Sequence, residues 1–326
     1  MCKRYLVADL LILTDGGGDI GFGHLMRCLA IKNVWSNGTA RLLAKMEGEE
    51  PSPDGAETFD WFSDAGKLKQ FATTSTLILV DSYRPNADYF RLLKSMFPFV
   101  VVLDDYNRIL YPVDLVICPG TYGKEMDYSN QIPVTVGGAE YVILRPEILA
   151  ARQLEIRETI ETILVAFGGS QQDEILFQQV IDILEGAGYQ AIVVTGNELL
   201  AKKLHGKISK IYGRLEPMKM AKIMASVDVA VSAAGQTLNE LAWLGVPTFS
   251  IRTGIDQQGN WKYYNYHSLS LAAVLHDNKN WESELKMVLK NETYKSRLER
   301  SHRLKNLLTA KGSEEICSLI DERFEG

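Results

Sequence analysis

The sequence predicts an α/β protein with two doubly wound parallel sheets, one in each of two domains. Short runs of valine, isoleucine and leucine alternate with longer amphipathic segments along the chain, which is the order expected of parallel strands joined by helices. Several runs are almost continuously apolar, as strands buried on both faces of a sheet are. A length of 326 residues is long for one domain and sufficient for two.

The first half of the chain holds the strands of the first sheet. These strands are expected at Tyr5–Leu13, Arg41–Ala44, Leu77–Val80, Val100–Leu103 and Leu115–Cys118. Between them, apolar residues at helical spacing predict helices at His24–Trp35 and Ala87–Met96.

A second set of elements follows. Its strands are expected at Thr162–Ala166, Gln190–Thr195, Val227–Ser232, Thr248–Ile251 and Ala272–Leu275, and its helices at Glu174–Gly186, Pro217–Ala225 and Thr237–Leu244. The boundary is expected near the charged segment Arg145–Arg157, which gives domains of residues 1–150 and 151–326. The tail from Glu282 onward is rich in Lys, Glu and Leu, and we expect it to form helices on the second domain.

Composition excludes several classes of protein. A formal net charge of −6 argues against a general nucleic-acid-binding protein, which carries a basic excess. Cys2, Cys28, Cys118 and Cys317 lie far apart, so reduced thiols are expected. The N-terminal apolar run contains Asp9 and lacks a cleavage site, and no apolar stretch reaches the roughly 20 residues that span a bilayer. We expect a cytoplasmic monomer without stable membrane insertion.

A glycine-rich segment follows the first strand and opens a helix. Gly16, Gly18 and Gly21 match the G-x-G-x-x-G pattern of dinucleotide-binding domains, so an NAD-dependent oxidoreductase stays open as an alternative. His24 and Arg27 are unusual for that pattern and lie one turn apart on one side of the helix. A lone histidine is often a packing or capping residue, but beside a glycine loop we expect His24 to act as a general base.

Acidic and aromatic side chains follow two neighbouring strands. Asp81 and Tyr83 come directly after Leu77–Val80, and Asp104 and Asp105 follow the next strand. Ligands of open α/β sheets bind outside the carboxyl ends of strands, although an Asp there is as often a helix N-cap. Paired carboxylates can hold a metal, but no further ligand has suitable spacing, so we expect no metal and no cofactor.

Two segments of the second domain suit a phosphate group. The turn at Gly168 to Ser170 offers backbone amides and a hydroxyl. The segment Ala234 to Thr237 opens a helix after a buried strand, where free N–H groups and the helix dipole can bind a diphosphate. Glu240, one turn further, can accept hydrogen bonds from ribose hydroxyls.

These motifs together resemble those of the UDP-sugar hydrolases of pseudaminic acid biosynthesis, and of the similar spore-coat polysaccharide proteins, within the GT-B nucleotide-sugar superfamily. The resemblance runs from about residue 10 to about residue 260. It rests on Gly21-Phe-Gly23-His24 with Arg27-Cys28, on Asp81-Ser-Tyr83, Asp104-Asp105, Leu144-Arg-Pro-Glu147 and Phe167-Gly-Gly-Ser170, and on Ala234-Gly-Gln-Thr237 with Glu240. The last of these motifs is shared by many GT-B enzymes.

The resemblance implies a GT-B fold, with two Rossmann-like domains whose parallel sheets face a central cleft. It also implies metal-independent removal of UDP from a deoxy-diacetamido sugar by water at the anomeric carbon. His24 is then the base, and Tyr83 and Asp81 complete the catalytic set. The expected substrate-binding residues are Gly21, Gly23, Arg27, Asp104, Asp105, Gly168, Gly169, Ser170, Ala234, Gly235, Gln236, Thr237, Glu240, Gln257 and Gln258.

The sequence departs from this family at three places. Gln171 stands where the family has Asp, Asp256-Gln257-Gln258 stands where it has Glu-Asn-Gln, and residues 259–275 are rich in aromatic side chains. The identity of the sugar therefore stays open, and so does the choice between hydrolysis and transfer. In a glycosyltransferase, His24 would deprotonate an acceptor hydroxyl, while a chain without activity would only bind the nucleotide-sugar.

Overall fold

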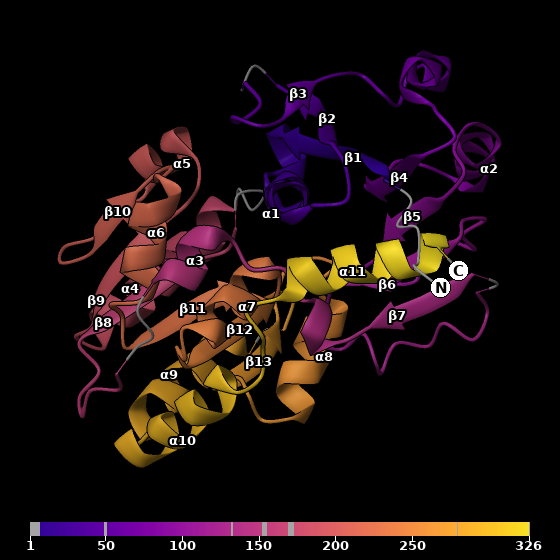
Figure 1. Cartoon of the computed structure of the whole chain (residues 1–326). Coiled ribbons are helices and arrows are strands. Elements are labelled where there is room, and N and C mark those ends of the chain that lie inside the picture. The colour runs from indigo at the N-terminus through magenta and orange to yellow at the C-terminus, as the bar shows by residue number, and fades with distance from the viewer. Residues whose placement is uncertain are drawn as a thin grey trace. The chain divides into compact units, whose positions relative to one another are not determined.

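The computed structural model describes residues 7–48, 51–131, 133–151, 155–168, 173–278 and 280–325. The chain divides into two compact units (Figure 1). Unit 1 contains Met1–Arg145 and Ala310–Gly326, and unit 2 contains Pro146–Thr309. Each unit carries its own parallel sheet and its own hydrophobic core.

The sheet of unit 1 has the strand order β3-β2-β1-β4-β5-β6-β7 among the described residues. Every described pair in it is parallel. Its strands are β1 Asp9–Gly17, β2 Ala40–Glu47, β3 Glu57–Thr58, β4 Thr76–Asp81, β5 Val100–Leu103, β6 Leu115–Cys118 and β7 Val134–Gly137. Its helices are α1 Gly23–Val34, α2 Ala87–Met96 and α11 Gly312–Glu325, with 3₁₀ turns η1 Gly18–Ile20, η2 Ala65–Phe71 and η3 Ala139–Tyr141.

The sheet of unit 2 has the order β10-β9-β8-β11-β12-β13 among the described residues. Its strands are β8 Thr162–Ala166, β9 Gln190–Val194, β10 Lys210–Tyr212, β11 Val229–Ala233, β12 Thr248–Arg252 and β13 Ala272–Leu275. Its helices are α3 Pro146–Ala150, α4 Glu174–Gly186, α5 Glu198–Lys203, α6 Pro217–Met224, α7 Gln236–Trp243, α8 Gln258–Tyr266, α9 Trp281–Asn291 and α10 Tyr294–Lys305.

Local chemistry explains where the crossover helices begin. The Asn86 side chain accepts a hydrogen bond of 2.9 Å from the backbone N–H of Tyr89 and caps α2. Asp173 caps α4 in the same way, through the N–H of Leu176 at 3.0 Å. Such caps satisfy backbone donors that the first helical turn leaves unpaired.

The strand predictions are confirmed, with differences at the sheet edges and in the first strand. β1 was expected to end at Leu13 but continues to Gly17, so the first glycines of the loop lie in the sheet. The edge strands β3, β7 and β10 were not predicted, because each is only two to four residues long and lacks a continuous apolar run.

The last helix differs from the expectation that the C-terminal tail packs on the second domain. α11 belongs to unit 1, where it packs beside α1 (Figure 1). Its Ile316 and Ile320 are fully buried in the core of unit 1. At its start, a Cβ on Gly312 would lie 2.0 Å from the carbonyl oxygen of Val142, so only glycine permits this approach.

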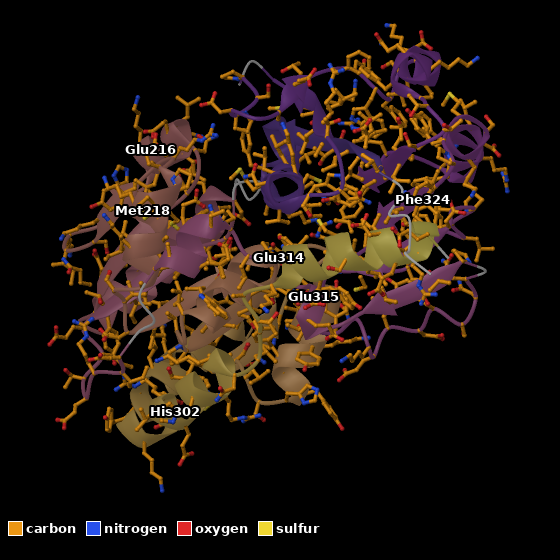
Figure 2. The ribbon with its side chains drawn as sticks, in the orientation of Figure 1. Glu216, Met218, His302, Glu314, Glu315 and Phe324 are labelled. Carbon is orange, nitrogen blue, oxygen red and sulfur yellow. The ribbon has the colours of Figure 1, made fainter. Side chains whose placement is uncertain are left out.

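The outer face of α11 is polar. Figure 2 labels Glu314 and Glu315 in its first turn, where carboxylates interact favourably with the positive end of the helix dipole. Near the other end, Phe324 contacts Phe99 edge to face, with 6.0 Å between ring centroids. The helix is therefore amphipathic, with one face on unit 1.

None of the described helices combines the length and the apolar character that a bilayer crossing needs. Cys28, Cys118 and Cys317 are buried free thiols, and Cys2 lies outside the described residues.

The strand order gives each unit a point where the chain changes direction across the sheet. In unit 1 this point lies between β1 and β4, and in unit 2 between β8 and β11. Ligands of open α/β sheets bind outside the carboxyl ends of the strands at such points. Most of the predicted site segments follow these four strands in sequence, while Asp104 and Asp105 follow β5, and Gln257 and Gln258 follow β12.

Candidate functional site

The glycine loop of unit 1 is a tight turn between β1 and α1. Gly17 and Gly21 exchange backbone hydrogen bonds of 2.9 and 3.1 Å, and both have positive φ. A Cβ on Gly17 would lie 2.4 Å from the carbonyl oxygen of Glu47 on β2. At Gly23, by contrast, a Cβ would meet nothing within 4 Å, so the helix starts beside open space. His24 is the second residue of α1.

His24 pairs with a fully buried carboxylate. Its Nδ1 lies 2.7 Å from Oδ1 of Asp81, the last residue of β4, whose side chain has no exposed area. Because an ionised carboxylate only accepts hydrogen bonds, Nδ1 carries the proton. In the neutral ring, the lone pair is then on Nε2, for which the described residues supply no hydrogen-bond partner. This tautomer is the one a general base needs.

Arg27 joins two carboxylates from neighbouring strand ends. Its Nε donates to Oδ2 of Asp81 at 2.5 Å, and Nη2 donates to Oδ1 at 2.5 Å. Toward Asp105, Nη1 and Nη2 donate to the two oxygens at 2.9 and 2.8 Å. The planar guanidinium suits such bidentate contacts, which a lysine ammonium cannot reproduce.

Tyr83 lies against the histidine ring. Its ring contacts that of His24 edge to face, with 4.7 Å between centroids, and its hydroxyl donates to Oδ2 of Asp105 at 2.6 Å. Tyr106, which was not predicted, packs edge to face on Tyr83 at 5.2 Å. Residues predicted separately on three segments therefore lie together at one edge of the unit 1 sheet.

The charges of this group shift its acid–base equilibria. For His24, burial favours the neutral ring, but the neighbouring carboxylate of Asp81 outweighs it and raises the pKa of His24 above its usual 6.5. Burial alone would raise the pKa of Asp81, yet Arg27 and His24 hold this pKa well below its usual range. Asp105 likewise has a lowered pKa, because Arg27 offsets its burial.

Asp104 contacts a different set of groups from those that its neighbour Asp105 contacts. It is fully buried, and its carboxylate accepts from the hydroxyls of Tyr111 at 2.6 Å and Tyr128 at 2.7 Å. It also accepts from the backbone N–H of Asn107 at 2.6 Å. These bonds tie together the loops after β5 and β6, which favours a structural role for Asp104 over contact with a substrate.

A second ion-pair group lies beside the glycine loop and was not predicted. Asp15 is buried at the end of β1 and accepts hydrogen bonds from the Ser82 hydroxyl and from Nε of Arg84 at 3.1 Å. Arg84 also pairs with Glu47. Burial raises the pKa of Asp15, although both partners act in the opposite direction. The sequence feature that could have revealed this ion-pair group is the run Ser82-Tyr83-Arg84 at a strand end.

In unit 2, the predicted diphosphate segments follow the neighbouring strands β8 and β11. Ser232 of β11 is in register with Ala166, the last residue of β8. Gly235 precedes α7 and makes no side-chain cap, and a Cβ on Gly235 or on Gly168 would meet nothing within 4 Å. The turn into α7 is therefore open at Gly235 itself. Glu240 lies one turn further in and is 3 % exposed.

The structure describes only some of the remaining predicted residues of unit 2. Gly169 and Ser170, like Gln171, lie outside the described residues. Gln257 accepts a hydrogen bond of 3.0 Å from the backbone N–H of Thr253, which fixes the loop before α8. The side-chain oxygen of Gln258 is buried, and no group in the described part of the chain bonds to it.

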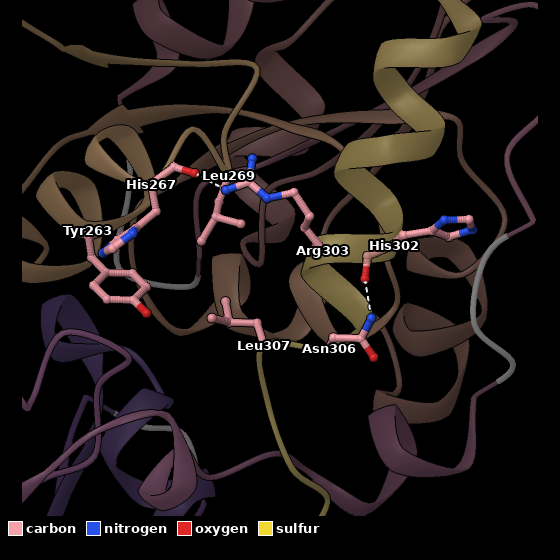
Figure 3. A pocket seen from close by; sticks show the side chains of 7 residues that line it. All are labelled: Tyr263, His267, Leu269, His302, Arg303, Asn306 and Leu307. Atoms are coloured by element: carbon pink, nitrogen blue, oxygen red, sulfur yellow. Dashed lines mark hydrogen bonds between the residues drawn. The ribbon is translucent and has the colours of Figure 1, made fainter.

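Two cavities among the described residues contain none of the predicted side chains. One, of about 400 Å³, lies at the C-terminal end of α8 (Figure 3) and is lined by Tyr263, His267, Leu269, His302, Arg303, Asn306 and Leu307. There Arg303 donates to the carbonyl oxygen of His267, as the dashed line shows. The other, of about 610 Å³, lies beside β7.

Across the described ranges, no three His, Cys, Asp or Glu side chains are grouped as metal ligands.

Comparison with known proteins relates the chain to enzymes of nucleotide-sugar chemistry. Residues 162–315 match the family model for the glycosyltransferase family 28 C-terminal domain. A Helicobacter pylori protein named pseudaminic acid cytidylyltransferase and UDP-2,4-diacetamido-2,4,6-trideoxy-beta-L-altropyranose hydrolase is 26% identical over 55% of this chain and 34% of its own length. The Campylobacter jejuni hydrolase of the same UDP-sugar is 22% identical, over 71% of this chain and 86% of its own.

Two further relatives are similar to this chain in sequence. The Bacillus subtilis spore coat polysaccharide biosynthesis protein SpsG is 25% identical over 72% of this chain and 75% of its own length. The chain spans 54% of an uncharacterized Methanocaldococcus jannaschii protein, so it covers about half or less of the length of that relative and of the Helicobacter one. The expected resemblance to the pseudaminic acid UDP-sugar hydrolases and the spore-coat proteins is thus confirmed.

Solved structures confirm the fold class. The glycotransferase of kitacinnamycin superposes with a TM-score of 0.63 at 12% identity, and covers 98% of this chain and 100% of its own. The Phytolacca americana enzyme UGT2 gives a TM-score of 0.60 at 12% identity with the same coverage. The chain has the GT-B fold, with two Rossmann-like units that each contain a parallel sheet.

Proposed function

We propose that this chain hydrolyses a UDP-activated deoxy-diacetamido sugar at its anomeric carbon and releases UDP. The observation that carries the proposal is the His24–Asp81 pair, which leaves Nε2 as an acceptor beside a glycine loop. Relatives named as hydrolases of such a sugar, at 26% and 22% identity, support the substrate class and the reaction.

In the proposed reaction, water attacks the anomeric carbon. The water oxygen forms a bond to that carbon, and the bond from the carbon to the diphosphate oxygen breaks with both electrons on the oxygen. Nε2 of His24 accepts the proton of the water, and Asp81 stabilises the imidazolium that results. The proton then passes to solvent, so His24 is regenerated.

The departing diphosphate needs donors where negative charge develops. We assign this role to unit 2, through Gly168, Gly235 and the first N–H groups of α7. The same segment contains Ala234, Gln236 and Thr237, to which we assign the same role. We assign Glu240 to binding of the ribose. Because a helix N-terminus binds anions without a metal, the reaction is proposed to be metal-independent.

The test is turnover of a UDP-sugar panel in ¹⁸O-labelled water without any acceptor. Attack at the anomeric carbon puts the label into the free sugar and leaves UDP unlabelled. Label in UDP or in a sugar phosphate would show cleavage at phosphorus and would contradict the proposal. Binding of UDP-sugars without turnover would mean that the chain is a nucleotide-sugar binder.

A glycosyltransferase is the second candidate, favoured by the family 28 match over residues 162–315 and by the glycosyltransferase structures above. His24 would then deprotonate an acceptor hydroxyl. The same panel with added acceptor alcohols decides between the two. A sugar–acceptor product formed faster than free sugar would establish transfer, while UDP release that is independent of the acceptor supports hydrolysis.

A further inference from the structure

We propose that Asp105, acting through Arg27, is a positioning residue that sets the pH range in which His24 is neutral and holds Tyr83 beside it. The sequence placed Asp105 and Arg27 among the substrate-binding residues; the geometry points to a different role for both. The part of this proposal that concerns turnover rests on the proposed function, and the part that concerns the protonation of His24 does not.

The side chains form a closed ring of contacts. His24 contacts Asp81 at 2.7 Å, and Asp81 pairs with Arg27 at 2.5 Å. Arg27 pairs with Asp105 at 2.8 Å, which accepts the Tyr83 hydroxyl at 2.6 Å. The Tyr83 ring closes the circuit on His24, with 4.7 Å between centroids. A displacement of any member therefore moves the base or the tyrosine.

Asp105 has little capacity left for a substrate. Its Oδ1 accepts from Nη1 of Arg27, and its Oδ2 accepts from Nη2 of Arg27 and from the Tyr83 hydroxyl. Its side chain is only 12% exposed. Arg27 is equally enclosed, at 12%, and its Nε and both Nη atoms point to carboxylates. The hydrogen-bonding atoms of both side chains are therefore used within this closed set of contacts.

The charges around His24 determine the direction in which its pKa changes when the charge of Asp105 is removed. The groups that act on it are Asp15 from β1, Arg27 from α1, Asp81 and Tyr83 at the end of β4, and Asp105 after β5, while Cys28 of α1 contacts Asp81. The carboxylates favour the imidazolium, and Arg27, whose Nη2 lies 3.1 Å from Nδ1, disfavours it. Removing the charge of Asp105 leaves the charge of Arg27 less neutralised, so the imidazolium becomes less stable.

The experiment measures the imidazole of His24 by ¹⁵N-edited NMR titration of the full chain, without substrate. The signal is assigned by its loss in His24→Asn. In Asp105→Asn, the pKa of His24 is expected to fall by about one unit, the low end of the range for a charge within a few ångströms. The matched control is Asp88→Asn, which removes a carboxylate that is 85% exposed on α2 and should leave the pKa unchanged.

Two further variants separate charge from geometry. Asp105→Glu keeps the charge, so the pKa of His24 should stay near the wild-type value while Tyr83 moves. Arg27→Lys keeps the opposite charge but cannot contact both carboxylates as a fork, so the ring signals of His24 and Tyr83 should both shift. If Asp105→Asn fails to fold, these two variants still test the ring. Unshifted ring signals of His24 and Tyr83 in Arg27→Lys, together with an unmoved Tyr83 in Asp105→Glu, would overturn the proposal.

Kinetics give the second readout. In Asp105→Asn, the acid limb of kcat/KM should move to lower pH by the same amount as the NMR pKa, and KM should stay constant. A raised KM with an unmoved acid limb would mean that Asp105 binds substrate, and would overturn its positioning role. An inactive wild-type chain would count against the proposed function alone, because the titration of His24 needs no turnover.

Discussion

The two ring nitrogens of His24 have different environments. Nδ1 is held by the buried carboxylate of Asp81, while Nε2 has no partner among the described residues. Asparagine is close to histidine in size and can keep the hydrogen bond to Asp81, but it has no group that accepts a proton at neutral pH. Substitution therefore separates a structural role of His24 from a chemical one.

We predict that His24→Asn lowers kcat by on the order of 10²–10⁴, the usual effect of losing a general base. The affinity for UDP should stay within error, because the diphosphate segments lie in unit 2. Stopped assays of UDP release and calorimetric titration with UDP measure the two quantities. His205→Asn, at an exposed position of unit 2, is the matched control. Near-normal turnover in a folded His24→Asn would mean that His24 is structural.

Most residues that lie around His24 in the structure were singled out in the sequence, but their pairing was not. Glycine spacing pointed to His24 and Arg27, and strand ends pointed to Asp81 and Asp105. The contact of Arg27 with Asp105 spans 78 positions of the chain, and no local pattern records such a pair. The adjacent carboxylates of Asp104 and Asp105 were treated alike because both follow β5, and only side-chain direction distinguishes them.

At the scale of elements, the buried strands were predictable because continuous burial leaves a continuous apolar run. β5 and β6, four residues each, are buried at every position and lie where they were expected. β3 consists of Glu57 and Thr58, both exposed, and pairs with β2 only through its backbone. A strand held by hydrogen bonds alone leaves no side-chain pattern, so this edge strand was missed.

The second prediction concerns α7. Glu240 lies one turn inside this helix, where we assign it to the ribose. Glu240→Ala should weaken UDP binding by about 1–3 kcal/mol, the range for hydrogen bonds to a charged group. Calorimetry with UDP measures this, together with a melting curve because Glu240 is buried. Glu299→Ala, at a carboxylate that is 67% exposed on α10, should have no effect. Unchanged UDP affinity in Glu240→Ala would remove this residue from the site.

The third prediction concerns how the diphosphate is neutralised. If the N–H groups at the start of α7 carry its charge, turnover should continue in excess chelator. The measurement is the rate of UDP release with EDTA and, as the control, with EDTA saturated by magnesium. Loss of activity in EDTA that magnesium or manganese restores would contradict this, and would return attention to the carboxylates of Asp104 and Asp105 as ligands.

At the scale of the whole molecule, the chain order and the folding units do not coincide. The polypeptide completes unit 2 at Thr309 and then supplies α11 to unit 1. The sequence does not reveal this, because the pattern of an amphipathic helix indicates which of its faces is buried but not the partner that buries it. The buried face of α11 is Ile316, Cys317 and Ile320, packed with the core that surrounds α1.

The last prediction tests this assignment. Ile320→Ala should destabilise unit 1 by about 2–5 kcal/mol, the usual cost of truncating a fully buried isoleucine, although residue 320 follows unit 2 in sequence. Hydrogen exchange followed by peptide mass spectrometry should show faster exchange in β1, β4 and α1, while peptides from β8, β11 and α7 keep their protection. The control is Leu199→Ala, at a side chain that is 71% exposed on α5 of unit 2 and contributes little to either core. If Ile320→Ala instead loosens the peptides of unit 2 and leaves those of unit 1 protected, α11 stabilises the unit that precedes it in sequence, and the division of the chain at Thr309 is wrong.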